Sequence, residues 1–196
     1  MIYLTIKHQS SKPTCTPFVL SSVLEYHYHI IFSTDYIYGN RDNEQYSGEG
    51  MLLRDGLRVI KTIGDVPYKD LPGNSYYKRA AKKVSKNEEH LKTLAARYRI
   101  RDYYRVKTIK DIKDALATDG PLAADLKFYK KHKVKQGVLT YIPSDNFFRH
   151  AVLIVGWNEK GLIIQNSWGR FWGKQGRCTV LYEDFKLFGE IYGVKN

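Results

Sequence analysis

The segment 149–173 constrains the fold more than any other part of the chain. It begins with His150 and an apolar run, and after a polar stretch a second apolar run leads to Asn166. Two apolar runs joined by a short turn at 158–161 predict a β-hairpin. A hairpin of this length can bring His150 and Asn166 side by side at one rim.

A histidine beside an asparagine suggests a catalytic pair. An imidazole whose one nitrogen bonds a carboxamide is fixed in one orientation and one tautomer, so its other nitrogen can take a proton from a nucleophile. Trp168 follows two residues after Asn166 and could shield that bond from water. The alternative is a buried hairpin with a structural histidine whose hydrogen bonds are satisfied in the core.

The residues around this pair resemble the histidine and asparagine regions of papain-like cysteine peptidases. His150 is followed by Ala-Val, Asn166 opens the run Asn-Ser-Trp-Gly, and Trp-Gly recurs at 172–173. This motif is long and specific, and it favours the catalytic interpretation. The resemblance implies an α+β fold similar to papain. A helical lobe and an antiparallel, barrel-like β lobe would hold the active site in the cleft between them.

The resemblance requires a cysteine nucleophile far upstream, at the start of a helix. Cys15 follows Gln9 with five residues between them, and Phe18 stands three residues later, as in the family pattern. Residues from Cys15 to about residue 31 follow a helical spacing, and Pro17 is tolerated in the first turn of such a helix. The free N–H groups and the dipole of a helix start stabilise a thiolate. The alternative role for Cys15 is a small buried thiol.

Two departures from the family pattern lie beside the nucleophile. Lys12 stands where the family usually has a second cysteine, and Thr16 stands where it usually has a tryptophan. The resemblance is therefore strong in the last third of the chain and looser in the first.

The resemblance implies hydrolysis of a peptide or protein substrate through a thioester. Cys15 would attack as a thiolate paired with a His150 imidazolium, which then protonates the leaving amine. Gln9 and the backbone N–H of Cys15 would form the oxyanion hole, and Asn166 would orient His150. No cofactor is implied. No metal is implied either, because the potential ligands are neither clustered nor spaced as in zinc sites.

The same resemblance assigns residues to substrate binding. In the family, a glycine-containing strip before the second helix pairs its backbone with the substrate, which implies Gly48, Gly50 and Met51 here. The alternative is that these glycines are ordinary turn residues before a helix. Trp168 is expected to border the same site.

A pocket for the second substrate residue before the cut is expected on the strand that follows 120–121. Counting along that strand gives Asp125, with Ala151 as a small neighbour. A carboxylate in such a pocket would favour lysine or arginine in the substrate, through charge-assisted hydrogen bonds. The alternative is that Asp125 faces solvent and pairs with a nearby lysine.

The chain is expected to form a single domain over 1–196, with a helical part at about 10–107. A β-rich part at about 108–196 would include an N-terminal strand at 2–6. Thr108 is expected to cap a short helix, with Asp111 at its third position. The remaining expectations are a loop at 32–50, further helices at 53–60 and 91–98, and strands at 122–128, 137–143, 151–155, 162–164 and 176–181.

Length and cysteine content limit the class of protein. The 196 residues permit one domain with a sizeable core, and no apolar run approaches the roughly 18 residues of a membrane helix. Two cysteines, Cys15 and Cys178, make no disulfide framework, and the first residues lack a signal peptide's apolar core. We expect a compact family member without a prosegment in a reducing, cytoplasmic compartment. An extracellular mature form remains open.

The chain has a formal charge of +12, concentrated at 76–107 and 127–135. Tyrosines lie among the basic residues of the first segment, as in some nucleic-acid surfaces. No nucleic-acid motif accompanies them, so a solvated basic face is favoured and nucleic acid is not an expected partner. An acidic substrate or partner remains open.

Two other functions fit the same sequence. A papain-like fold can serve as a silent binding or structural protein, although such a protein needs none of the four residues Gln9, Cys15, His150 and Asn166. The same acyl-transfer chemistry also serves hydrolases of other amides, such as isopeptides or cell-wall peptides.

Overall fold

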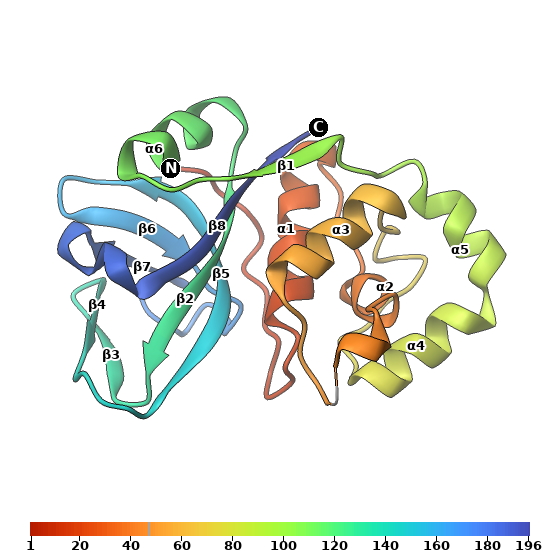
Figure 1. The fold of residues 1–196 in the computed structure, drawn as a ribbon, viewed down its shortest axis with the longest axis horizontal. Helices are drawn as coiled ribbons and strands as arrows, with labels where there is room; N and C mark the ends of the chain where they lie inside the picture. The colour runs from red at the N-terminus through yellow and green to blue at the C-terminus, as the bar shows by residue number, and fades with distance from the viewer. Residues whose placement is uncertain (47) are drawn as a thin grey trace. The chain divides into compact units, whose positions relative to one another are not determined.

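The computed structural model describes residues 1–46 and 48–196, and it divides the chain into two compact units. The β unit comprises 1–8 and 104–193, and the helical unit comprises 9–103 and 194–196. Figure 1 shows helices α1 to α5 in the helical unit, and the sheet with helix α6 in the β unit. The predicted α+β class is confirmed.

An eight-stranded sheet, in the order β1-β8-β2-β5-β6-β7-β4-β3, forms the framework of the β unit. Its strand pairs run antiparallel from β8 through β2, β5 and β6 to β7, whereas β4 and β7 are parallel. The strands are β1 (Asp102–Arg105), β2 (Leu122–Tyr129), β3 (His132–Lys135), β4 (Val138–Tyr141), β5 (Phe147–Trp157), β6 (Gly161–Gln165), β7 (Arg177–Leu181) and β8 (Phe188–Lys195).

The core of the β unit lies against one face of this sheet. Alternate residues of β2, including Leu126 and Phe128, point into it, whereas Asp125 lies on the opposite face. Helix α6 (Ile109–Thr118) contributes Ile112 to the same core. The predicted cap of α6 is confirmed, because the backbone N–H of Asp111 donates to the Thr108 hydroxyl at 3.1 Å.

The helical unit is organised around α1 (Cys15–Tyr28), nine of whose residues are buried. Its partners are α2 (Thr34–Gly39), α3 (Leu53–Thr62), α4 (Tyr77–Lys86) and α5 (Glu88–Ala95). Helix α3 packs closely on α1 at Gly56, where an added Cβ would lie 2.4 Å from the Leu20 side chain. Within 1–46 and 48–196, no helix is long and apolar enough to cross a membrane.

Two α-helices, α2 and α4, were not predicted from the sequence. The loop expected at 32–50 contains α2, which Ser33 caps by accepting the N–H of Tyr36 at 3.1 Å. The Ser-Thr-Asp run that suggested a loop is the start signal of this helix. Helix α4 was also missed, because its basic sequence buries only two side chains.

The strand expected at 2–6 is absent, because these residues form no ladder with the sheet. The segment alternates between exposed and half-buried side chains, as predicted, and the N–H of Ile2 donates to the carbonyl of Val155 at 2.7 Å. Two backbone carbonyls of this segment accept hydrogen bonds from side chains, whereas in a sheet they would accept from the backbone of a neighbouring strand. Gln165 donates to Thr5 and Arg177 donates to Leu4.

Candidate active site

The hairpin of β5 and β6 places His150 beside Asn166, as the sequence predicted. Register partners Leu153 and Gln165 align the two strands, so His150 lies on β5 near the position where the chain leaves β6. The Nε2 of His150 lies 2.8 Å from the Oδ1 of Asn166. Both side chains are buried.

The hydrogen bonds of Asn166 define the tautomer of His150. The Oδ1 of Asn166 also accepts the backbone N–H of Ser167 at 2.7 Å, which identifies this atom as the amide oxygen. An oxygen only accepts, so Nε2 of His150 carries the proton and donates it. The other ring nitrogen, Nδ1, is then the acceptor and can receive a proton from a nucleophile.

Aromatic rings surround the imidazole. Trp168 stacks on His150 with ring centroids 4.6 Å apart, and its role as a shield over the hydrogen bond stays a prediction. Phe128 meets the imidazole edge-on at 5.6 Å, and Phe148 stacks on Phe128. Neither phenylalanine was predicted from the sequence to lie at the site. The pairing of Phe128 with Phe148 across β2 and β5 is the signal that could have found them.

Burial controls the charge of this histidine. It lowers the pKa of His150 from 6.5 to about 4, the bond to Asn166 acts in the opposite direction, and nearby His132 lowers the pKa further. The imidazole is therefore neutral near pH 7 unless a negative partner lies beside it. A neutral imidazole with an open Nδ1 is equipped to act as a base.

The low pKa of His150 predicts that stability depends on pH. The folded-state pKa is about 4 against an ordinary 6.5, so the unfolded chain binds this proton more tightly. The stability that follows is fully present above the ordinary pKa and is lost as the pH falls toward the folded pKa. Its full size is about 3 kcal/mol, at roughly 1.36 kcal/mol per pKa unit.

Urea unfolding of wild type and His150→Gln, measured across this pH range, tests the prediction. Glutamine can still donate to Asn166 but does not titrate. Between about pH 7 and pH 4 the free energy of unfolding should fall about 3 kcal/mol more in wild type than in the variant. If the free energy of unfolding changed with pH in the same way in wild type and in the variant, His150 would not be a buried neutral imidazole.

Cys15 and Gln9 lie in the helical unit, at the start of α1. Cys15 is the first residue of that helix and is half-buried. The loop before it folds back through turns, and the side-chain amide of Gln9 donates to the carbonyl of Lys12 at 2.7 Å. Asn74 donates to the carbonyl of Gln9 at 2.8 Å. These two bonds fix Gln9, which is 6% exposed.

The second thiol, Cys178, has the environment of a structural residue. It lies in β7, is 3% exposed and belongs to the core of the β unit. Burial raises the pKa of Cys178 to about 12. Both cysteines are reduced.

Arg41 anchors the glycine strip 48–50, and the sequence analysis missed it. Its guanidinium donates to the carbonyls of Gly48 and Gly50 at 2.8 and 2.6 Å. The rings of Tyr38, Tyr46 and Tyr77 surround it at 5.4, 4.6 and 4.0 Å. Arg41 is 4% exposed, so the strip is held by a buried cation.

Further bonds hold the strip on both sides of Glu49. The N–H of Gly50 donates to the Tyr38 hydroxyl at 2.7 Å, and the φ of Gly50 is +102°, a conformation that favours glycine. The Met51 carbonyl accepts the Thr16 hydroxyl at 2.7 Å. In the described part of the chain, the backbone N–H and carbonyl of Glu49 have no hydrogen-bond partner. Among the described residues the N–H groups of Gly48 and Met51 also have no partner, so the open backbone groups of the strip are those two N–H groups together with the N–H and carbonyl of Glu49.

Asp125 and Ala151 are direct partners in the register of β2 and β5. The Asp125 carboxylate accepts two hydrogen bonds from Arg149, of which the one from Nε measures 2.8 Å. The side chain of Asp125 is 26% exposed, and Ala151 is buried. The alternative to a pocket role was that Asp125 faces solvent and pairs with a nearby lysine. Asp125 does have a basic partner, but this partner is Arg149. The pocket role of Asp125 stays a prediction.

The site residues fall into two groups. The β unit brings together His150, Asn166 and Trp168, and it pairs Asp125 with Ala151. The helical unit contains Gln9, Cys15 and the strip of Gly48, Gly50 and Met51. No group of three or more His, Cys, Asp or Glu residues in 1–46 and 48–196 is arranged to hold a metal ion.

Known proteins share this sequence and this fold. The viral cathepsins of Antheraea pernyi and Choristoneura fumiferana nuclear polyhedrosis viruses are 29% and 31% identical over 145 and 144 residues, which is 67% of this chain. The chain spans only 40% of the length of either relative.

Among solved structures, xylellain, a cysteine protease from Xylella fastidiosa, is similar with a TM-score of 0.82 and 23% identity. The alignment covers 100% of this chain and 84% of xylellain. The Carica candamarcensis cysteine protease CMS1MS2 gives a TM-score of 0.70 at 14% identity, covering 97% of this chain and 92% of that protein. At these identities the similarity establishes the fold, and the predicted papain-like architecture is confirmed.

A family model described as papain family cysteine protease matches residues 29–187. The match includes His150 and Asn166 and begins after Cys15. The match covers well over half of the chain. Both residues of the His150–Asn166 hydrogen bond lie within it. The chain therefore belongs to the papain family of cysteine proteases.

Proposed function

We propose that the protein is a cysteine peptidase that cleaves peptide bonds with Cys15, His150 and Asn166. The observation that carries the proposal is the hydrogen bond from His150 Nε2 to Asn166, which leaves Nδ1 as the acceptor nitrogen of a buried ring. Support also comes from Cys15, which occupies the first position of α1, where helix N–H groups stabilise a thiolate.

Catalysis begins with proton transfer from the Cys15 thiol to Nδ1 of neutral His150. Both charges of the ion pair form in this one step, so the imidazolium is balanced by the thiolate. The thiolate attacks the scissile carbonyl, and the oxyanion accepts hydrogen bonds from the Gln9 amide and the backbone N–H of Cys15. His150 then protonates the leaving amine, and a thioester remains on Cys15.

Water completes the cycle. The neutral imidazole removes a proton from water as it attacks the thioester, and a second oxyanion forms at the same donors. Collapse of this intermediate releases the carboxylic acid, and the proton on His150 returns to the sulfur. Trp168 keeps bulk water from the His150–Asn166 bond, so the imidazole keeps its orientation through both halves of the reaction.

Digestion of a diverse peptide library by wild type and Cys15→Ala, read by mass spectrometry, tests this proposal. Cleavage by wild type alone supports a peptidase. An intact library with both proteins would favour a silent binding protein. Isopeptide and cell-wall peptide substrates are assayed separately. Cleavage of these substrates alone would show that the protein hydrolyses an amide bond other than that of ordinary peptides.

The peptide substrate pairs with the strip at Glu49. Gly48 and Gly50 already give their carbonyls to Arg41, and Gly50 gives its N–H to Tyr38. The backbone N–H and carbonyl of Glu49 are an adjacent donor and acceptor that can bond an extended chain in the manner of a short antiparallel ladder.

Arg41 variants should lose activity on extended peptides and keep it on short substrates. Both bonds come from Nη1 of a planar guanidinium held against three tyrosine rings, which the compact ammonium of lysine does not reproduce, so Arg41→Lys and Arg41→Met should let the strip move. Displacement of a binding group by about 1 Å costs on the order of 100-fold, and we expect kcat/KM for an extended peptide to fall by roughly 10- to 100-fold. Hydrolysis of a single-residue ester, which does not reach the strip, should change by less than about threefold.

Arg58→Lys is the matched control, because Arg58 is 52% exposed and pairs with Asp55 at 3.3 Å. Thermal melting of all variants checks that they fold. Equal losses on the ester and on the extended peptide would contradict the role of Arg41 in positioning the strip.

Asp125 should favour a basic residue at the second substrate position before the cut. Its carboxylate accepts from Arg149, and charged hydrogen bonds contribute about 1.5–3 kcal/mol. Peptides with Arg or Leu at this position, assayed against wild type and Asp125→Asn, measure the effect. The preference for Arg should fall about tenfold in the variant. An unchanged ratio of Arg to Leu cleavage would show that Asp125 does not contact the substrate.

A further inference from the structure

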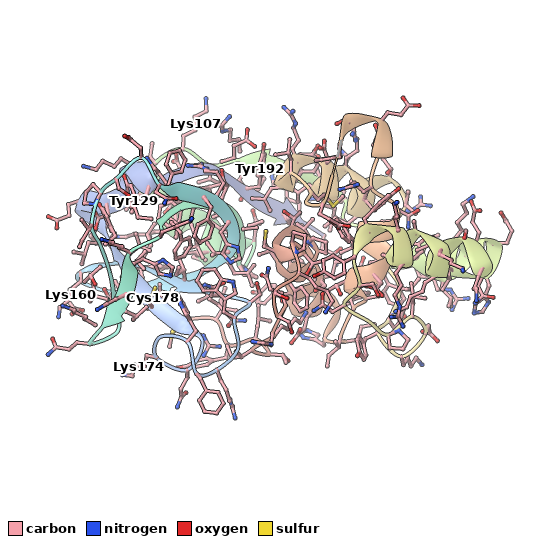
Figure 2. All side chains as sticks on the ribbon, turned by 90° about the horizontal axis from the view of Figure 1, so that it is seen from below. Lys107, Tyr129, Lys160, Lys174, Cys178 and Tyr192 are labelled. Atoms are coloured by element: carbon pink, nitrogen blue, oxygen red, sulfur yellow. The ribbon has the colours of Figure 1, made fainter. Side chains whose placement is uncertain are left out.

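A cavity of about 420 Å³ lies in the β unit and shares no residue with the candidate active site. The N-terminal segment, the turns after β3 and β5, and the loop before β7 form its walls, which include Tyr3, Lys160, Ile163, Lys174 and Arg177. Figure 2 labels Lys160 and Lys174 near Cys178, another lining residue. The volume is within the range of about 300–1,000 Å³ typical of small-molecule sites.

The charges of this cavity are unbalanced. Lys160, Lys174 and Arg177 line it, and Glu159 is the carboxylate among the lining residues. In the residues that the structure describes, neither lysine forms an ion pair. An anion entering the cavity would therefore meet cations that are not already neutralised by a carboxylate.

Arg177 is held by hydrogen bonds to two neighbouring residues. Its Nε and Nη2 donate to the Gln165 side-chain oxygen at 3.1 and 2.8 Å, and Nη2 also donates to the Leu4 carbonyl at 3.2 Å. The Tyr3 ring lies 5.3 Å from the guanidinium. These contacts fix the plane of the guanidinium before any ligand binds.

The partners of Arg177 are all neutral, unlike those of Arg149 and Arg105. Arg149 pairs with Asp125, and Arg105 pairs with Glu190. Burial lowers the pKa of Arg177, as expected for a cation that has lost water without gaining a carboxylate. Over the described residues, its Nη1 has no hydrogen-bond partner, so donors remain for a ligand.

We propose that this cavity binds a small, doubly charged oxyanion, either a phosphate group or a dicarboxylate. The two N–H groups of Nη1, held in place by the bonds of Nε and Nη2, would donate to the oxyanion, and the two lysines would add point charges at the rim. Ile163 and the Tyr3 ring would contact the apolar part of an organic ligand. The inference is independent of peptidase activity.

Calorimetric titration of the whole protein with inorganic phosphate and with succinate, at fixed ionic strength, tests this site. Lys160→Ala/Lys174→Ala removes the rim charges without touching the bonds of Arg177. Lys130→Ala/Lys131→Ala is the matched control, because these exposed lysines carry the same charge elsewhere in the β unit. We expect at least one probe to bind, about tenfold weaker binding in the cavity variant, and a change below twofold in the control.

Arg177→Lys adds a second test that keeps the charge and removes the fixed Nη1 donors. It should weaken binding of the same probe, whereas thermal melting should show a folded protein. Preference for phosphate or succinate identifies which oxyanion the site takes. Absence of binding for both probes, or equal losses in the cavity and control variants, would overturn the proposal.

Discussion

Replacing Cys15 by alanine should abolish peptide hydrolysis, with kcat falling by about 10⁶-fold, as for other nucleophiles that act within a catalytic unit. Without the thiol no thioester forms, and the remaining groups can only bind the substrate. Single-turnover assays on a peptide that wild type cleaves measure the loss. Cys178→Ala should retain turnover, because Cys178 is a core residue of β7.

Alkylation distinguishes the two thiols without any substrate. Cys15 lies half-buried at a helix start, whereas Cys178 is 3% exposed and burial raises its pKa to about 12. Near neutral pH, iodoacetamide should modify Cys15 more than about 100-fold faster than Cys178, as read by peptide mass spectrometry. Similar rates at both cysteines in the folded protein would rule out Cys15 as the activated nucleophile.

Gln9→Ala should lower kcat by about 10²–10³, the loss measured when one oxyanion donor is removed. The amide of Gln9 is held by the Lys12 carbonyl at 2.7 Å, so the donor is already fixed before the transition state forms. The KM for the same peptide should change little, because the oxyanion forms only during the reaction.

The rate of Cys15 alkylation controls for this variant, since it reports the nucleophile and not the oxyanion hole. It should remain within about threefold of wild type. Asn166→Ala should reduce turnover less than Cys15→Ala does, because Asn166 orients a catalyst and does not react. Full turnover by Gln9→Ala would exclude Gln9 from the oxyanion hole.

The parts of the site that could be predicted depend on short stretches of sequence. The hairpin follows from two apolar runs and a turn, and strand register then brings His150 to Asn166. The start of α1 at Cys15 follows from a helical repeat with proline in its first turn. These features could be predicted because each depends on residues that lie within about twenty positions of one another in the sequence.

The missed elements show where local patterns are ambiguous. The Ser-Thr-Asp run before α2 fits a loop as well as a helix cap, and burial of Tyr36 against the rest of the helical unit decides between them. The alternation at 2–6 fits an edge strand. The side chains of Gln165 and Arg177, more than 150 residues away, bond its carbonyls instead.

The sequence by itself determined the family, the α+β class and the His150–Asn166 pair, because periodicity and motif spacing are properties of the local chain. Only the tertiary structure decided which partners the charged groups take. Arg41 holds the glycine strip among three tyrosine rings, Asp125 bonds Arg149, and Arg177 faces a cavity with neutral partners. Many charged residues compete for each such contact, and packing of segments distant in sequence selects one of them.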